Sequence, residues 1–168
     1  MLLEMEVTGL ALDPSSNTPI LILKTKGSES GEEERTLPIW IGLLEAASIA
    51  MALQGVEFHR PMTHDLFKAF LDSVSAKVEK VEVTELKDNT YFARIHFATE
   101  GGSFSMDARP SDAIAMALRA QCPIFAEDDV ITKSTTVPPP GQPEDTSEEG
   151  KKWAEYLESL DPDAFTKV

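Results

Sequence analysis

The sequence predicts an α+β domain in which a mixed or antiparallel sheet is covered by about three helices, followed by a C-terminal linker and a short helix. Strand-length segments with alternating or continuous apolar residues occur in both halves of the chain, and three longer segments have helical apolar spacing. Hydrophobic residues make up 42% of the 168 residues, which is enough for a core. Composition changes sharply at Thr132. We therefore expect a domain over residues 1–131, a flexible, acidic, Pro-rich linker over 132–149, and a short amphipathic helix over 150–168.

The first third of the chain reads as three strands and a helix. Residues 2–12 and 19–25 are predicted strands joined by a turn rich in Asp, Pro, Ser and Asn. A third strand is predicted over 35–41. The helix predicted over 43–54 is apolar on almost every side, so we expect it to be buried on more than one face.

The middle and the end of the domain supply the remaining elements. Thr63 is the predicted N-cap of a helix whose apolar stripe runs to Val74. Further strands are predicted over 77–84, 90–98 and 103–108, with a hairpin at Glu100-Gly101-Gly102. A helix over 110–120, a short strand over 124–126 and a short helix over 127–131 complete the domain.

Two of these helices share a pentapeptide. Ile49-Ala50-Met51-Ala52-Leu53 recurs as Ile114-Ala115-Met116-Ala117-Leu118. Either the two helices are equivalent halves of one repeated unit that pack closely through alanine, or alanine-rich helices resemble each other by composition. The sequence leaves both interpretations open.

Charge and cysteine content limit the function and the location. The formal net charge is −14, and residues 1–126 carry eighteen acids against eleven bases. Generic nucleic-acid binders carry a basic face, and this chain has no Lys/Arg cluster. We expect no membrane span, because no uncharged apolar run reaches 18 residues. The N-terminus lacks a basic leader, and the single cysteine, Cys122, is expected to be a buried inert thiol, so we predict a cytoplasmic location.

The segment Asp107-Ala108-Arg109-Pro110-Ser111-Asp112 places two carboxylates, a guanidinium and a hydroxyl where a strand gives way to a helix. One interpretation is a site in which the acids hold a divalent cation and Arg109 binds a phosphate oxygen, a combination common in phosphodiester hydrolysis. The other is a capped helix start, with Pro110 in the first turn, Ser111 and Asp112 satisfying free N–H groups, and Arg109 paired with Asp107 or Asp112. These residues alone favour the capped helix.

A second polar cluster contains His59, Arg60, His64 and Asp65. The histidines are candidate metal ligands or general bases, with Asp65 orienting one imidazole. Their spacing matches no standard ligand motif, and His64 and Asp65 also suit a helix start. Glu45 is the single charge on its apolar helix, where a capping-box role after Gly42 is favoured over an acid–base role.

Taken together, these motifs resemble the bifunctional nuclease (BFN) family. The matching segments are Leu37–Gly42, Glu45-Ala46, Arg60–Leu66 and Asp107–Ala115, in the same order and spacing, and the resemblance covers residues 1–131. It implies a compact α+β domain, usually oligomeric, with activity on both DNA and RNA. The motifs include Arg60, His64, Asp65, Asp107, Arg109, Ser111 and Asp112, and the roles of these residues have to be argued from their chemistry.

We therefore expect a nuclease that hydrolyses DNA and RNA with low sequence preference and depends on Mg²⁺ or Mn²⁺. Asp107, Asp112 and Asp65 are the predicted metal ligands. His64 is the predicted base, and Arg60 and Arg109 are the predicted phosphate clamps. The chain is expected to form a homo-oligomer through the apolar helix over 43–54. The alternative is a non-catalytic oligomeric module that binds a small anionic ligand or a protein partner, which the acidity of the domain favours.

Overall fold

The described part of the chain folds around one open, seven-stranded mixed sheet with four helices packed against it. This computed structural model describes residues 1–27 and 34–135. In those residues the elements are β1 (Leu2–Leu12), β2 (Pro19–Thr25), β3 (Thr36–Trp40), α1 (Leu43–Leu53), α2 (Thr63–Ser73), β4 (Lys77–Lys87), β5 (Thr90–Thr99), β6 (Gly102–Ala108), α3 (Pro110–Ala120), β7 (Ile124–Glu127) and α4 (Asp128–Ser134). The α+β class with a mixed sheet is as predicted.

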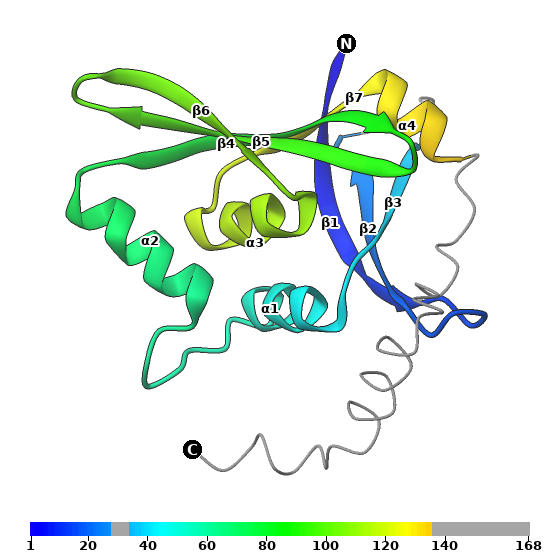
Figure 1. The fold of residues 1–168 in the computed structure, drawn as a ribbon, viewed down its shortest axis with the longest axis horizontal. Coiled ribbons are helices and arrows are strands. Elements are labelled where there is room, and N and C mark those ends of the chain that lie inside the picture. Colours follow the sequence, from blue (N-terminus) through cyan, green and yellow to red (C-terminus); the bar gives the residue numbers. More distant parts are fainter. Residues whose placement is uncertain (28–33, 136–168) are drawn as a thin grey trace, which may run out of the picture.

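The sheet has the strand order β3-β2-β1-β7-β4-β5-β6. The pairing of β4 with β7 is parallel, and the other neighbours pair antiparallel. Figure 1 shows that β4, β5 and β6 cross β1, β2 and β3 at a steep angle, so the sheet is strongly twisted. The twist brings the start of β5 to β3, where the Tyr91 hydroxyl donates a hydrogen bond to the Pro38 carbonyl at 3.0 Å.

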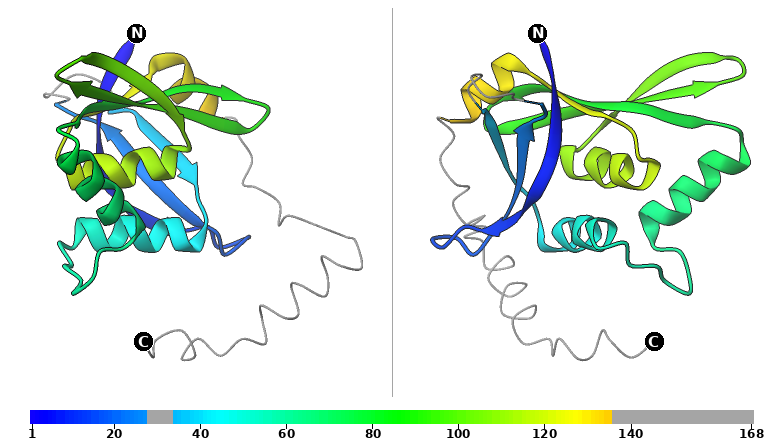
Figure 2. Two further views of the ribbon diagram at one scale, coloured as in Figure 1. Left: turned by 60° about the vertical axis from the view of Figure 1, so that its left-hand side comes forward. Right: turned by 180° about the vertical axis from the view of Figure 1, so that it is seen from behind.

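The three longer helices lie together, and α4 lies apart from them beside β7 (Figures 1 and 2). Helix α3 packs on β4 and β5 and also contacts both α1 and α2. Its residues from Ala113 to Ala117 are all at most 1% exposed, because small alanines let the helix approach its neighbours closely. Helix α2 buries only Leu71, so it is the most peripheral of the three. No helix in the described ranges is long and apolar enough to cross a membrane.

The element boundaries agree closely with the prediction at most positions and differ at three. The N-cap of α2 is Met62, so the prediction of Thr63 as the cap is wrong by one residue. Strand β4 continues three residues beyond Thr84. Helix α4 runs to Ser134, whose side chain is buried, whereas the sequence predicted that the linker begins at Thr132. The rest of the expected linker and the C-terminal helix over 150–168 lie outside the described residues.

The repeated pentapeptide lies on two helices that do pack against each other, α1 and α3. The strand order is symmetric about β7: β1-β2-β3 leads to α1, and β4-β5-β6 leads to α3. The pentapeptide does not occupy equivalent positions in the two halves, since Ile49 is the seventh residue of α1 and Ile114 is the fifth residue of α3. The topology therefore supports two similar halves, although the five matched residues do not align with them.

The turn between β1 and β2 is organised by a buried carboxylate. Asp13 Oδ1 accepts hydrogen bonds from the Ser15 backbone N–H at 2.8 Å and from the Ser15 hydroxyl at 2.7 Å. Its Oδ2 accepts a 3.2 Å bond from the Trp40 indole, which links the turn to the end of β3. These bonds, those from Ser15 first, lower the pKa of Asp13 from 3.8 to about 2.

We expect Asp13→Asn to lower the melting temperature at neutral pH and to lower it by less at acidic pH. Because the pKa of Asp13 is lower in the folded than in the unfolded chain, its stabilisation is present above about pH 4 and is lost as the pH falls towards 2. Thermal denaturation followed by circular dichroism should show the difference between wild type and variant shrinking over that interval. Asp88→Asn, at an exposed turn, is the matched control. A difference that is constant with pH would contradict this account.

Candidate functional site

The starts of α1, α2 and α3 form the polar part of the molecule that the motifs pointed to. Each helix carries an acid at its third residue: Glu45 in α1, Asp65 in α2 and Asp112 in α3. A carboxylate in the first turn is favourable because the free N–H groups there carry partial positive charge. Each of these carboxylates also accepts a hydrogen bond from an arginine, and two arginines therefore link the three helices.

Arg109 bridges α1 and α3. Its Nε donates to Asp112 Oδ2 and its Nη1 donates to Glu45 Oε1, both at 2.8 Å. These two carboxylates, Asp112 first, raise the pKa of Arg109. Glu45 does lie three residues after the N-cap Gly42, but no side chain caps α1, so the capping-box interpretation of Glu45 is corrected: its carboxylate pairs with Arg109.

His64 connects the bridge to α1. Its Nε2 lies 3.0 Å from Asp112 Oδ1, and its Nδ1 lies 2.9 Å from the Ser48 hydroxyl. Burial acts to raise the pKa of Asp112, but hydrogen bonds from Arg109 and His64 outweigh it and hold that pKa below its usual value. An ionised carboxylate can only accept, so Nε2 carries the proton of a neutral His64 and Nδ1 is left to accept from Ser48.

Arg119 is a member of the site that the sequence analysis missed. Its Nε donates to Asp65 Oδ1 at 2.5 Å, and its Nη2 donates to the Ser48 carbonyl at 3.2 Å. Only 10% of its side chain is exposed. Burial acts to raise the pKa of Asp65, and the bonds from Arg119 and the Met62 N–H lower it on balance. A single arginine in the last turn of α3 and a single hydroxyl on the apolar helix α1 were the available signals for Arg119 and Ser48.

Two hollows open on either side of this network. The first, of about 420 Å³, lies between α1, α2 and α3 and is lined in part by Ser48, Met51 and Met62. The second, of about 460 Å³, lies between α2, α3 and the strands β5 and β6. Thr63, His64, Arg109 and Asp112 line both hollows.

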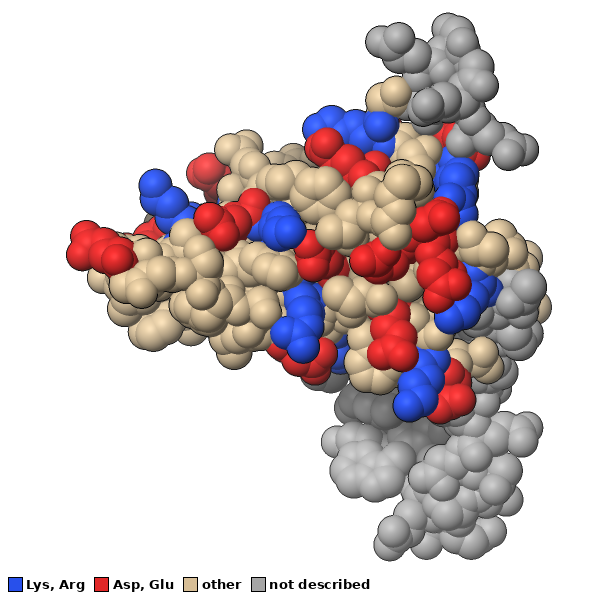
Figure 3. Space-filling model, turned by 90° about the horizontal axis from the view of Figure 1, so that it is seen from above, with Lys and Arg blue, Asp and Glu red and all other residues tan. Residues whose placement is uncertain are grey.

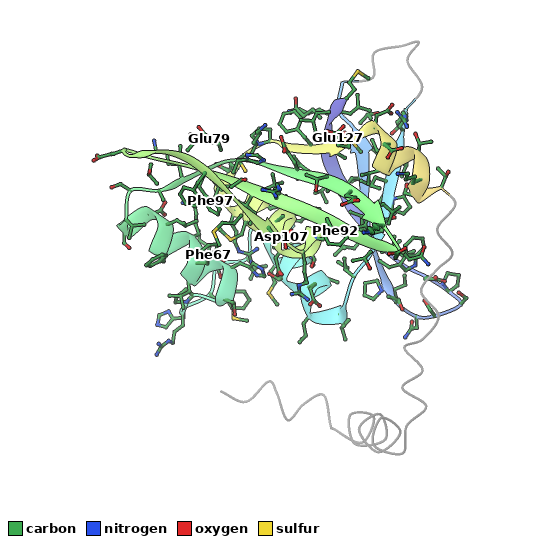
Figure 4. All side chains as sticks on the ribbon, turned by 45° about the horizontal axis from the view of Figure 1, so that its top comes forward. Phe67, Glu79, Phe92, Phe97, Asp107 and Glu127 are labelled. Atoms are coloured by element: carbon green, nitrogen blue, oxygen red, sulfur yellow. The ribbon has the colours of Figure 1, made fainter. Side chains whose placement is uncertain are left out.

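Asp107 belongs to the second hollow. It lies near the end of β6 that leads into α3 (Figure 4) and is exposed. No hydrogen bond or ion pair joins its carboxylate to another residue in the described part of the chain, and the partner of Arg109 is Asp112 rather than Asp107. The structure thus brings His64, Asp107, Arg109 and Asp112 to one hollow.

Arg60 and His59 stand apart from this group. Both are exposed in the connector before α2 and line none of the hollows described here. The structure therefore places Arg109 at these hollows and leaves Arg60, the other predicted phosphate clamp, outside them. Cys122 is half-buried, and burial raises the pKa of its thiol to about 11, so the thiol stays protonated at neutral pH and is a poor nucleophile, as predicted.

The predicted metal ligands do not form a closed cage. Within residues 1–27 and 34–135, no group of three or more His, Cys, Asp or Glu side chains is placed to hold a metal ion. Asp65 faces Arg119, whereas Asp107 and Asp112 line the same hollow. Both oxygens of Asp112 already accept hydrogen bonds, Oδ1 from His64 and Oδ2 from Arg109.

The surface charge is mixed. On the face of the molecule shown in Figure 3, lysines and arginines are interspersed with a larger number of acids, and they form no broad basic area. Contact with a polyanion would therefore depend on local positive groups such as Arg109.

Comparisons with known proteins agree with the sequence motifs. The family model described as the bifunctional nuclease domain matches residues 21–138. An uncharacterized protein of Mycobacterium tuberculosis is 34% identical over 167 residues, covering 96% of this chain and 97% of that protein. Bifunctional nuclease 1 of Arabidopsis thaliana is 32% identical over 91 residues, which is 52% of this chain and 28% of the plant protein. Bifunctional nuclease 2 of Oryza sativa subsp. japonica is 28% identical over 119 residues, which is 69% of this chain and 35% of the rice protein.

The bond between Asp65 and Arg119 predicts a local effect on α2. Because α2 buries only Leu71, we expect Asp65→Asn to speed amide hydrogen exchange in α2 while β4 and β5 keep their protection. Hydrogen exchange followed by mass spectrometry measures both regions. Asp72→Asn, which removes a surface i,i+4 pair with Lys68 on the same helix, is the control. Equal acceleration across the whole domain would show that the bond does not act locally.

Proposed function

The chain belongs to the bifunctional nuclease domain family, and from that membership we propose that it hydrolyses phosphodiester bonds of DNA and RNA at the His64–Asp112–Arg109 group. The observation that supports this proposal is the hydrogen-bonded series Ser48–His64–Asp112–Arg109, whose members His64, Arg109 and Asp112 line two hollows. It joins a proton acceptor to a cation, and both kinds of group assist phosphodiester hydrolysis.

His64 is the proposed general base. Asp112 fixes the ring with the proton on Nε2, so Nδ1, which lies 2.9 Å from the Ser48 hydroxyl, is the acceptor; His64 and Ser48 both line the first hollow. A water molecule that takes the place of the Ser48 hydroxyl gives its proton to Nδ1 as its oxygen attacks phosphorus. The bond from phosphorus to the leaving sugar oxygen breaks, and that oxygen takes a proton from solvent. The positive imidazole that results lies against the Asp112 carboxylate, which stabilises it. Ser48 is a positioning residue in this scheme, because its hydroxyl holds the ring in place between turnovers.

Arg109 is the proposed phosphate clamp. Its side chain is 66% exposed, and it uses Nε and Nη1 for its two carboxylate partners, so Nη2 remains for a phosphate oxygen. A planar guanidinium can keep such pairs and still present N–H donors to an anion. It stabilises the charge that develops on the phosphoryl oxygens during attack.

The acidity of the domain is the reason that we propose a divalent ion as well. Residues 1–126 carry an excess of seven acids, which repel a phosphate backbone. Asp107 and Asp112 would hold the Mg²⁺ or Mn²⁺ ion, which would supply positive charge and acidify a bound water. Asp65 does not line the hollow that Asp107 and Asp112 share, and it is left out of this proposed ligand set.

We expect nuclease activity to disappear with EDTA and to return with Mg²⁺ or Mn²⁺. We also expect Asp107→Asn to lower turnover by at least about a hundredfold, while the melting temperature stays unchanged because no described residue bonds its carboxylate. Release of acid-soluble nucleotides from single-stranded DNA and from RNA gives the rate. Glu79→Gln is the matched control, since Glu79 is also exposed and lies on β4, which β5 separates from the strand of Asp107.

The protein must be purified free of host nuclease, because a trace contaminant gives weak nonspecific activity. Full activity of Asp107→Asn in EDTA would reject the metal role. Wild-type protein that is inactive with every metal would favour the alternative of a non-catalytic module that binds an anion or a protein.

We further propose that the protein is a homo-oligomer and that α1 forms part of the contact. Leu43 and Leu44 are 74% and 83% exposed, and Leu44 lines the first hollow with Met51 and Met62. Helix α2 adds exposed Leu66, Phe70 and Val74. Large exposed apolar side chains on two helices that border the same hollow support a protein contact there.

Light scattering of the wild type at micromolar concentration should give a multiple of 18.4 kDa. Leu43→Ser combined with Leu44→Ser should shift it towards the monomer, because each buried leucine contributes about 1.5–3 kcal/mol. Leu12→Ser, at an exposed leucine on β1, is the control. A monomeric wild type would refute the proposal.

A further inference from the structure

A third hollow, of about 280 Å³, lies where α1 and α3 both begin. Its wall is formed by the end of β3 with Gly42, by the turn between β4 and β5 at Asn89, and by the start of α3 at Ser111. Arg109 and Glu45 are the two charged residues that line it. Since Arg109 also lines the first two hollows, this third one adjoins the proposed catalytic group.

Both helix starts that meet here lack a side-chain cap. Neither Gly42 before α1 nor Arg109 before α3 provides a capping hydrogen bond. The N–H groups of the first turn have no partner within a helix, and they concentrate partial positive charge. Two eleven-residue helices therefore begin at one hollow, and because Pro110 has no N–H the free donors of α3 start at Ser111.

Ser111 supplies an independent observation. It is only 6% exposed, it lines the hollow, and its hydroxyl makes no hydrogen bond to any residue in the described ranges. The Ser111 oxygen is not among the fully buried side-chain atoms that lack a partner in the described residues, so it reaches the open space of the hollow and is free to bond a group there. An acceptor placed in this hollow would satisfy it.

The chain already places one anion at this position. Glu45 pairs with Arg109, and its Oε2 lies 2.2 Å from the point where a Cβ on Gly42 would be. Gly42 is therefore a residue whose missing side chain gives the carboxylate its space. The volume of about 280 Å³ is much larger than the roughly 30 Å³ of one water molecule, so space remains beside the carboxylate.

We propose that the third hollow is a phosphate-binding subsite, in which a phosphate group is held by Arg109, the Ser111 hydroxyl and the N–H groups that start α1 and α3. Glu45 is its internal competitor, since the carboxylate shares Arg109 with the incoming phosphate and repels it. This inference rests on the proposed function for the source of the phosphate, a nucleic-acid strand whose next phosphodiester lies at His64. The binding of phosphate itself can be tested without any catalysis.

The test is a titration of the full chain with inorganic phosphate, followed by amide NMR. We expect the largest shifts at residues 43–45 and 111–112. Glu45→Gln should strengthen phosphate binding by about tenfold, because one negative charge a few ångströms away is removed and Arg109 is released. Glu57→Gln makes the same change of charge at an exposed residue of the connector and should leave binding unchanged.

Ser111→Ala should weaken binding several-fold without lowering the melting temperature, since its hydroxyl bonds no described residue. Ser103→Ala, at an exposed serine of β6, is its control. A second titration uses a short oligonucleotide that has no terminal phosphate. It distinguishes binding of an internal phosphodiester from binding of a free or terminal phosphate. Shifts at the same amides show that internal phosphodiesters enter the hollow, and shifts with inorganic phosphate alone would restrict the subsite to free or terminal phosphate.

The proposal is overturned if phosphate shifts no amide at either helix start, or if Glu45→Gln binds phosphate no better than the wild type. Should Glu45→Gln fail to fold, the wild-type shifts and Ser111→Ala still decide the matter. The outcome is distinct from that of the nuclease proposal. Phosphate binding without hydrolysis would support the subsite and contradict the nuclease proposal. Hydrolysis with no shift at these amides would support the nuclease proposal and contradict the subsite.

Discussion

The bridge that Arg109 makes between Glu45 and Asp112 is the interaction on which the site depends. It joins the first turns of α1 and α3, which come from opposite halves of the sheet and are 64 residues apart in sequence. Without the guanidinium, two carboxylates would face each other at the same place, and like charges at short range are unfavourable. Arg119 likewise joins Asp65 of α2 to the backbone of α1. The two arginines thus allow three acidic helix starts to share one region.

The value of these pairs lies more in geometry than in stability. The Arg109 side chain is 66% exposed, and exposed ion pairs contribute about 0–1 kcal/mol. Burial of α3 against the sheet contributes far more, since the side chains along its inner face are almost completely inaccessible to solvent. What the bridge adds is a fixed orientation. It holds Asp112, Asp112 sets the ring of His64, and His64 reaches Ser48 on α1.

An acidic protein that acts on a polyanion has to confine its positive charge. The cations of the network are already paired with acids, so they produce little positive electrostatic potential away from the surface. The proposed catalytic group and the proposed phosphate subsite meet at Arg109, which lines all three hollows. Specific local donors would then take the role that a broad basic face has in other nucleic-acid proteins.

Periodicity and turn chemistry in the sequence were sufficient for the α+β class and for nearly all element boundaries, because each strand and helix carries its own local pattern. The motifs also located His64, Asp107, Arg109 and Asp112, which do line one hollow. Sequence spacing could not show that Arg109 pairs with Glu45, that Arg119 holds Asp65, or that Arg60 lies outside the group. Those relations join residues that are far apart along the chain, and the twist of the sheet and the packing of α1 and α2 on α3 decide them. Local pattern therefore determined the elements and the candidate residues, and tertiary packing decided which of them form a site, because only packing sets distances between separate elements.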